Sequence, residues 1–284
     1  MPTVENFAPY RSRWELPDAR RYFARAPDPL SVSLLAECED GVLCRREVSF
    51  AAGASVEGIA TLVLPASQAI TRGVVLAHGG SDDGRQFFVS EAAALAARGA
   101  AVILPATRIR LDDGVDAFAA DVKNAVLTER AALDVLVDAG APPGALSFLG
   151  HSAGGALAAI LSAVEPRLAR IAIFGNGAGS LARSTLAVGL SRGNPITEEL
   201  AAVTDWFDLA HFVGVERRAR LLVQHGRADG TVSIEAARAL FDAAAQPKLW
   251  AEYDCDHSLD ADPQAGEDRS EFVMETSPSY SDCQ

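Results

Sequence analysis

One short segment of the sequence holds a serine in a setting that could make it a nucleophile. Residues 150–155 read Gly-His-Ser-Ala-Gly-Gly, which is a G-x-S-x-G pattern centred on Ser152. By itself this pattern is common in chains rich in glycine and alanine. Here it follows an apolar run that ends at Leu149 and precedes apolar residues at helical spacing from Ala153. In such a strand–turn–helix context a sharp turn presents the hydroxyl beside a helix N-terminus, so we expect Ser152 to be a nucleophile.

A serine hydroxyl needs a general base, and a histidine base needs a group that orients it. Of the five histidines, His257 follows the last predicted strand, while the others lie in turn motifs, in an insertion or at a strand end. Asp229 lies just past an earlier strand end and could hold the imidazole in the required tautomer. We expect His257 as the base and Asp229 as its partner. The chain has 38 acidic residues, and three stay open as alternatives: Asp205, Asp208 and Asp256.

The rest of the sequence predicts the framework that would position these residues. Short apolar runs alternate with stretches of helical periodicity, which is typical of βαβ units and of a mostly parallel sheet covered on both faces. The predicted strands are 46–50, 58–64, 73–77, 101–104, 145–149, 171–174, 221–224 and 248–253. The predicted helices are 15–24, 86–98, 117–139, one from 153 and 233–245.

We expect an α/β fold in three parts. Residues 1–30 are predicted to be an N-terminal arm, and residues 31–269 an α/β domain. Residues 176–218 exceed an ordinary connection and hold apolar residues between turn signals, so they are predicted to form a small helical insertion. Residues 270–284 are polar and are predicted to form a C-terminal tail.

The order Ser152, Asp229, His257 resembles the α/β-hydrolase superfamily, and within it the branch of dienelactone hydrolases and prolyl-oligopeptidase-like esterases. The resemblance covers about residues 46–269. It rests on His-Gly-Gly at 78–80, the serine segment at 150–155, G-x-x-D-x-x-V at 226–232 and Asp-His-Ser-Leu at 256–259. It implies an α/β-hydrolase fold and the roles given above for the three residues. Dienelactone hydrolases proper use a cysteine nucleophile, so the serine favours the esterase side.

Acyl transfer also needs preorganised donors for the developing oxyanion. One donor should be the backbone N–H of Ala153, directly after the nucleophile. The resemblance implies a second donor in the loop after the third strand, where residues 78–81 match the family's H-G-x position. We expect Gly80 in this role, with Gly79 as the alternative.

Contacts to the substrate are expected from the loops around the crevice. Arg108 follows a strand end and could bind a substrate carboxylate, although exposed arginines are usually solvated. Trp206 and Phe207 lie in the insertion, which we expect to form a lid over the crevice. Their apolar character favours a substrate with a hydrophobic part, but a lid must also pack its own underside.

Composition limits the classes of function. The chain is 49% apolar and 22% charged, which predicts a large core. Its net charge of −13 argues against nucleic-acid and membrane-surface partners. The N-terminus has no apolar signal region, and the four cysteines form no C-x-x-C pair, which together predict a cytoplasmic protein with reduced thiols. No metal-ligand spacing and no phosphate-binding loop is present, so we expect neither metal nor cofactor.

These observations predict a serine hydrolase that cleaves a small-molecule carboxylic ester through an acyl-enzyme intermediate. The same three residues could act on a thioester or a peptide, or transfer the acyl group to an acceptor other than water. Outside enzymes, the alternative is a catalytically silent hydrolase fold used for binding. Such proteins usually lose one of the three residues, and this chain has all of them.

Overall fold

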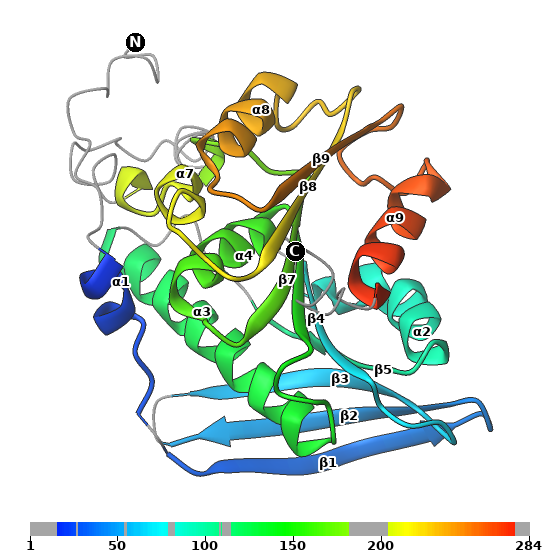
Figure 1. Ribbon diagram of the computed structural model, residues 1–284. Coiled ribbons are helices and arrows are strands. Elements are labelled where there is room, and N and C mark those ends of the chain that lie inside the picture. The colour runs from blue at the N-terminus through cyan, green and yellow to red at the C-terminus, as the bar shows by residue number, and fades with distance from the viewer. Residues whose placement is uncertain are drawn as a thin grey trace, which may run out of the picture.

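The computed structural model describes residues 16–26, 28–53, 56–78, 83–107, 109, 115–181 and 204–275. Within them the chain forms a nine-stranded sheet with the order β1-β2-β3-β5-β4-β6-β7-β8-β9 (Figure 1). From β4 onward the strands are parallel, and β1, β2 and β3 extend one edge in antiparallel fashion. The strands are β1 (Leu30–Glu39), β2 (Leu43–Ala52), β3 (Glu57–Pro65), β4 (Arg72–His78), β5 (Ala100–Pro105), β6 (Leu146–His151), β7 (Leu168–Phe174), β8 (Arg220–Gly226) and β9 (Lys248–Tyr253).

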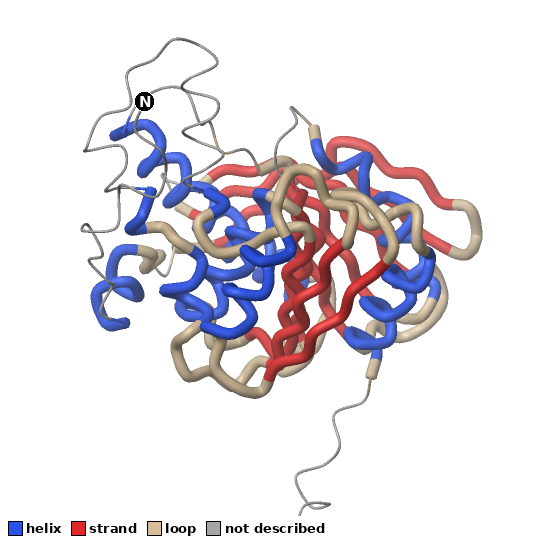
Figure 2. Tube along the Cα trace, turned by 90° about the horizontal axis from the view of Figure 1, so that it is seen from above, coloured by secondary structure: helices blue, strands red, loops and turns tan. Residues whose placement is uncertain are grey.

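Helices cover both faces of this sheet (Figures 1 and 2). One face carries α1 (Leu16–Tyr22), α3 (Val115–Asp138), α4 (Ala153–Val164), α7 (Leu209–Val213) and α8 (Ile234–Ala243). The other face carries the 3₁₀ helix η2 (Gly84–Phe88), α2 (Val89–Ala97) and α9 (Pro263–Met274).

The central strands are apolar on both sides because each face has its own core. In β4, Val75 and Ala77 belong to the apolar cluster under α3 and α4, while Val74 and Leu76 belong to the cluster under α2 and α9. Successive side chains of a strand point to opposite faces, so a sheet covered twice needs a continuous apolar run. This architecture confirms the predicted α/β fold with a mostly parallel central sheet and helices on both faces.

Strand β1 was not predicted, although its first five residues carry the strand signal. Leu30-Ser31-Val32-Ser33-Leu34 alternates apolar and polar residues, which is the pattern of a half-buried strand, and the sequence analysis missed it. Nine of the ten residues of β1 are exposed, and the strand lies at the edge of the sheet, so here the alternation does not mark a buried face.

Helix α9 was also not predicted. It starts in the sequence Asp262-Pro263, where the Asp262 side chain accepts a hydrogen bond from the N–H of Gln264 and proline occupies the first helical turn. The helix runs to Met274, and Phe272 and Val273 are buried against the sheet. The domain boundary predicted at residue 269 is therefore too early.

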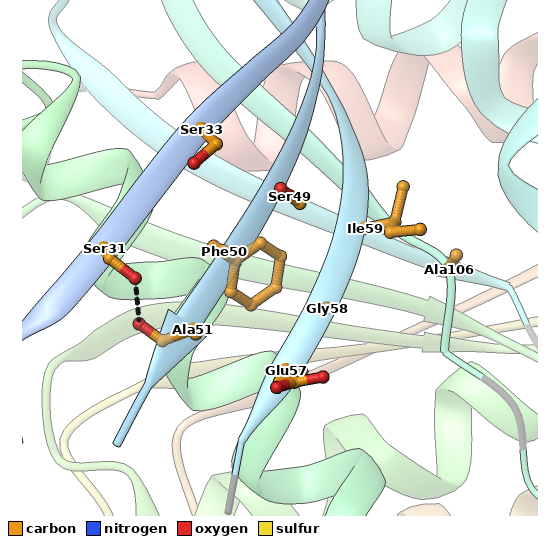
Figure 3. Close-up of a pocket in the computed structure, with 9 residues that line it drawn as sticks. All are labelled: Ser31, Ser33, Ser49, Phe50, Ala51, Glu57, Gly58, Ile59 and Ala106. Atoms are coloured by element: carbon orange, nitrogen blue, oxygen red, sulfur yellow. Dashed lines mark hydrogen bonds between the residues drawn. The ribbon is translucent and has the colours of Figure 1, made fainter. Parts of the chain in front are cut away.

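A hollow of about 580 Å³ lies over the antiparallel strands β1, β2 and β3 (Figure 3). Three serine side chains and Glu57 line it together with Ile59, and the Ser31 hydroxyl donates to the carbonyl of Ala51. None of the predicted site residues is among its lining residues. The predicted chemistry therefore has to be sought at the end of β6.

Candidate active site

Ser152 lies in a strained turn between β6 and α4. Its backbone has φ 52° and ψ −120°, a conformation that residues other than glycine rarely adopt. Its N–H donates to the carbonyl of Phe174, and its own carbonyl accepts from the N–H of Gly155 at 2.8 Å. The structure thus holds the serine in the turn that the sequence predicted, at the carboxyl end of a central parallel strand.

Two glycines make this turn possible because the backbone segments pass very close to each other. A Cβ on Gly150 would lie 2.1 Å from the carbonyl oxygen of Gly154. A Cβ on Gly154 would lie 2.0 Å from the carbonyl oxygen of Ala77 in β4. Neither separation is sterically possible, so any side chain at either position would push α4 away from the strands.

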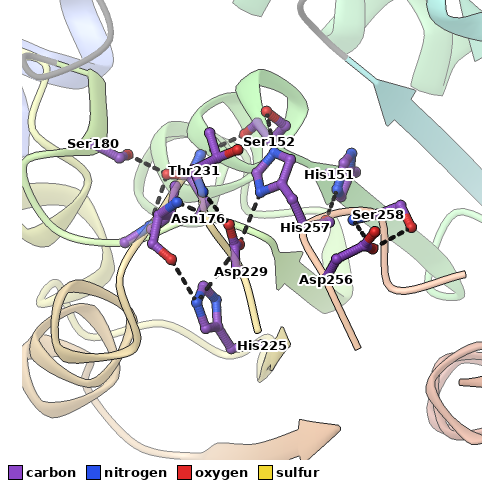
Figure 4. Close-up of polar contacts among 12 residues, drawn as sticks. His151, Ser152, Asn176, Ser180, His225, Asp229, Thr231, Asp256, His257 and Ser258 are labelled. Carbon is purple, nitrogen blue, oxygen red and sulfur yellow. Dashed lines mark hydrogen bonds and ion pairs between the residues drawn. The ribbon is translucent and has the colours of Figure 1, made fainter. Parts of the chain in front are cut away.

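His257 and Asp229 come to Ser152 from two neighbouring strand ends (Figure 4). Asp229 follows β8 and His257 follows β9. The Ser152 hydroxyl lies 3.1 Å from Nε2 of His257, and Nδ1 of His257 lies 2.8 Å from Oδ2 of Asp229. The carboxylate can only accept, so Nδ1 carries the proton and Nε2 is left to accept the proton of the hydroxyl. Serine, histidine and aspartate thus form one continuous chain of hydrogen bonds.

The surroundings of Asp229 keep its carboxylate ionised. Burial alone would raise its pKa, because the side chain is only 1% exposed. Hydrogen bonds from His257 and from the N–H groups of Val232 and Thr231 oppose this and hold the pKa below its usual value. The aspartate is therefore negatively charged at neutral pH and can stabilise a positively charged imidazole.

Two of the alternative acids have other contacts. Asp256 is exposed, and its carboxylate accepts from the N–H and the hydroxyl of Ser258. Asp208 caps α7 and accepts from the N–H groups of Ala210 and Gly179. Of the residues that the structure describes, the carboxylate in contact with Nδ1 of His257 is that of Asp229.

His151 holds the backbone of His257 in position. Its Nε2 lies 2.7 Å from the carbonyl oxygen of His257 and donates to it. Burial lowers the pKa of His151 to about 3, so the ring is neutral over the physiological range. The ring also stacks on Phe87 at 5.1 Å. The sequence analysis treated His151 only as part of the serine motif, and no spacing signal could have shown a hydrogen bond to a distant backbone carbonyl.

Asn176 braces the serine turn from the end of β7. Its side-chain amide donates to the carbonyl of Ser152, while its Oδ1 accepts from the N–H of Gly177 and the hydroxyl of Ser180. The residue is 4% exposed. It was not predicted, because a lone asparagine after a strand looks like an ordinary turn residue.

His225 lies beneath Asp229 and is completely buried. Its Nε2 donates to the carbonyl of Val232 at 3.0 Å and lies 3.6 Å from Oδ2 of Asp229. Burial lowers its pKa, and the nearby carboxylate opposes the shift without cancelling it. Through these contacts His225 supports the loop that carries Asp229.

The expected oxyanion donors fall partly outside the described residues. Ala153 is the first residue of α4, directly after Ser152. Gly79 and Gly80 lie outside the described residues, but His78 before them pairs with His151 across β4 and β6. The two rings lie 5.0 Å apart, so His78 at the end of β4 lies beside the serine turn.

The three expected substrate contacts have different outcomes. Arg108 lies outside the described residues. Trp206 is 39% exposed. Phe207 is 1% exposed and packs against the rings of Phe23 and Phe118, so its side chain belongs to the core and is not available to a substrate. Its apolar character reflects packing of the insertion against the domain, as the alternative interpretation held.

Among the described residues, no group of three or more histidine, cysteine, aspartate or glutamate residues is arranged to hold a metal ion. In the same part of the chain, every helix is too short or too polar to cross a bilayer.

Comparisons with known proteins identify the fold. No family model and no curated protein sequence matches the chain. Solved structures do match. An acetyl xylan esterase from Paenibacillus sp. R4 is 16% identical, with a TM-score of 0.73 over 96% of this chain and 99% of that one. An S-formylglutathione hydrolase from Agrobacterium tumefaciens is 16% identical, with a TM-score of 0.61 over 86% and 99%. A Klebsiella pneumoniae protein provisionally assigned as a dienelactone hydrolase is 12% identical, with a TM-score of 0.58 over 88% and 100%. The chain has the fold of the α/β hydrolases.

Proposed function

We propose that this α/β-hydrolase-fold chain is a serine hydrolase that cleaves a small carboxylic ester through an acyl-enzyme intermediate. The observation that carries the proposal is the hydrogen-bonded chain from Ser152 through His257 to Asp229 at the end of a central strand. A nucleophile, a base and an orienting acid in contact are the minimum that acyl transfer by serine requires.

In the first step, Ser152 Oγ attacks the ester carbonyl while Nε2 of His257 takes the hydroxyl proton. The imidazolium that forms is stabilised by the ionised Asp229, which keeps its charge throughout. His257 then gives the proton to the leaving alcohol, and the acyl group remains on Ser152. In the second step a water molecule loses its proton to His257, attacks the acyl-enzyme and releases the acid.

The tetrahedral intermediates of both steps carry a negative oxygen. The N–H of Ala153 and the N–H of Gly80 are proposed as its donors, with Gly79 as the alternative for the second. The position of Ala153 supports the first donor, because it opens α4, where backbone N–H groups are free of partners within the helix. The dipole of α4 adds positive potential at the same place.

The substrate is proposed to carry a small acyl group. The supporting observation is the likeness of the chain over nearly its full length to an acetyl xylan esterase, whose name refers to an acetyl ester. Contacts from Arg108 and Trp206 to the rest of the substrate stay predictions. A cytoplasmic location also stays a prediction from the cysteines and the N-terminal sequence.

A panel of p-nitrophenyl esters from acetate to decanoate tests the proposal, with a thioester and a peptide amide alongside. We expect hydrolysis to be fastest with acetate and to begin with a burst of p-nitrophenol equal to the enzyme concentration, because the acyl-enzyme forms before it hydrolyses. Ser152→Ala should abolish both the burst and the turnover. Turnover of every ester by Ser152→Ala at the wild-type rate would refute the proposal.

A further inference from the structure

Three arginines lie together near the amino ends of the parallel strands, at the end of the sheet opposite to Ser152. Arg72 is the first residue of β4, Arg170 is the third residue of β7, and Arg220 is the first residue of β8. Arg170 pairs in register with Arg220 on one side and with Ser147 of β6 on the other. The side chains of the three arginines therefore point to the sheet face that α9 covers.

The C-terminal end of α9 supplies the partners of this cluster. Arg72 donates to the backbone carbonyls of Met274 and Glu275. Arg220 donates to the carboxylate of Glu275. The guanidinium carbons of Arg170 and Arg220 lie 6.0 and 5.8 Å from the ring centroid of Phe272.

Arg170 is the unusual member of the group. Its side chain is 2% exposed, and its Nη2 lies 3.6 Å from the Glu275 carboxylate, beyond a hydrogen bond. Within the described part of the chain, both Nε and Nη2 are buried without a hydrogen-bond partner. Burial and repulsion from Arg72 and Arg220 lower the pKa of Arg170, and the Glu275 carboxylate opposes this shift without cancelling it. A buried guanidinium with two unsatisfied N–H donors and one long ion pair is destabilising, so these donors call for a further acceptor.

The charges of the cluster do not balance. Among the described side chains that contact the cluster, three guanidinium groups face one carboxylate, that of Glu275, which leaves an excess of two positive charges. The chain as a whole has a net charge of −13. Guanidinium groups match the oxygens of phosphate and carboxylate by paired N–H donors. The side chains of Arg220 and Glu275 are 35% and 50% exposed, so solvent reaches the cluster from their side.

We propose that Arg72, Arg170 and Arg220 form a binding site for a doubly charged oxyanion such as phosphate, with Glu275 occupying part of it in the free protein. The anion satisfies the free donors of Arg170 and links the end of α9 to three strands. The site is distinct from the proposed ester-cleaving site, because it lies at the amino ends of the parallel strands, whereas Ser152 follows the carboxyl end of β6.

Thermal unfolding in increasing phosphate, against chloride at equal ionic strength and pH, tests this proposal. We expect the midpoint of the wild type to rise with phosphate along a saturable curve and to stay unchanged in chloride, as linkage requires for a ligand that binds only the folded state. In Arg170→Met the response should need at least roughly tenfold more phosphate, because charge-assisted hydrogen bonds are lost. Arg220→Gln, at a partly exposed position, should weaken the response in the same direction if Arg170→Met does not fold.

Two further variants separate binding from a purely structural role. Glu275→Gln should lower the phosphate concentration at half-saturation, because it removes the competing carboxylate. Arg227→Gln is the matched control: its side chain is 51% exposed and pairs with Asp254, so the same charge is lost away from the cluster and the response should not change. Equal responses to phosphate and chloride, or a wild-type phosphate response in both Arg170→Met and Arg220→Gln, would overturn the proposal. Ester hydrolysis should be unaffected by these variants, so the result is independent of the proposed function.

Discussion

The substitution Asp229→Asn changes one atom of the hydrogen-bonded chain and reverses its polarity. Oδ1 of Asp229 accepts from the N–H groups of Thr231 and Val232, at 2.7 and 2.9 Å. In the variant the amide oxygen must stay at this position, so the amide NH₂ faces Nδ1 of His257. An NH₂ group only donates, so Nδ1 must accept and the imidazole proton moves to Nε2. The nitrogen that faces Ser152 then carries a proton and can no longer act as a base.

The size of the effect follows from this reversal. The variant loses the correct tautomer and also the negative charge that stabilises the imidazolium. Because the Asp229 side chain is 1% exposed, water cannot take over either role. In serine proteases the same change lowers kcat about 10⁴-fold, which corresponds to about 5.5 kcal/mol in the activation free energy. We expect a loss of roughly 10³- to 10⁴-fold here, with little change in KM.

The assay is steady-state hydrolysis of p-nitrophenyl acetate at neutral pH, with circular dichroism to show that each variant is folded. Asp256→Asn is the matched control, because it makes the same change next to His257 at an exposed carboxylate that contacts Ser258. We expect the control to keep its activity within about threefold of the wild type, as for other surface substitutions. A loss of less than tenfold in Asp229→Asn, or an equal loss in Asp256→Asn, would refute the reasoning.

Three further predictions concern the supports of the site and of the sheet. Asn176→Ala should lower the free energy of unfolding by roughly 1–3 kcal/mol, since the Ser152 carbonyl loses the buried side-chain donor that braces the turn; an unchanged stability in urea unfolding would contradict this. His151 has a folded pKa of about 3 against an ordinary 6.5, so it favours the folded state fully above pH 6.5 and progressively less as the pH falls toward 3. Between pH 7 and pH 4.5 the free energy of unfolding in urea should therefore fall by roughly 2–3 kcal/mol less in His151→Gln than in the wild type, and equal losses would disprove it. Arg269→Met should reduce the free energy of unfolding by about 3–5 kcal/mol, because the partly buried Glu91 carboxylate loses both of its hydrogen bonds to the guanidinium; a change below about 1 kcal/mol in chemical denaturation would exclude this.

The sequence predicted most of the sheet because the fold buries it on both sides. The apolar runs 73–77 and 101–104, for example, are buried strands in the structure, as their composition and length predicted. Strand β1 was missed although Leu30, Val32 and Leu34 alternate with serines, and its exposure shows that this alternation does not always mark a buried face. Helix α9 was missed because its polar residues and its place near the chain end looked like a tail.

The candidate site was predicted from the serine motif and from a family resemblance. The serine turn has a recognisable sequence, and the chain order serine, aspartate, histidine resembles that of the α/β hydrolases, which led to Ser152, Asp229 and His257. The roles of His151 and Asn176 could not be predicted, because each contacts a backbone carbonyl, and a carbonyl is the same in every residue. Phe207 was placed at the substrate because sequence alone does not tell an apolar lid from an apolar core.

Labelling with a fluorophosphonate probe, followed by peptide mass spectrometry, tests the central claim that Ser152 is an activated nucleophile. The wild type, Ser152→Ala and His257→Ala are compared, each shown to be folded. The account predicts one label per chain, located on Ser152, and none in either variant. Label on another serine, or a wild type that is neither labelled nor active on p-nitrophenyl acetate, would contradict it and favour a hydrolase fold used only for binding.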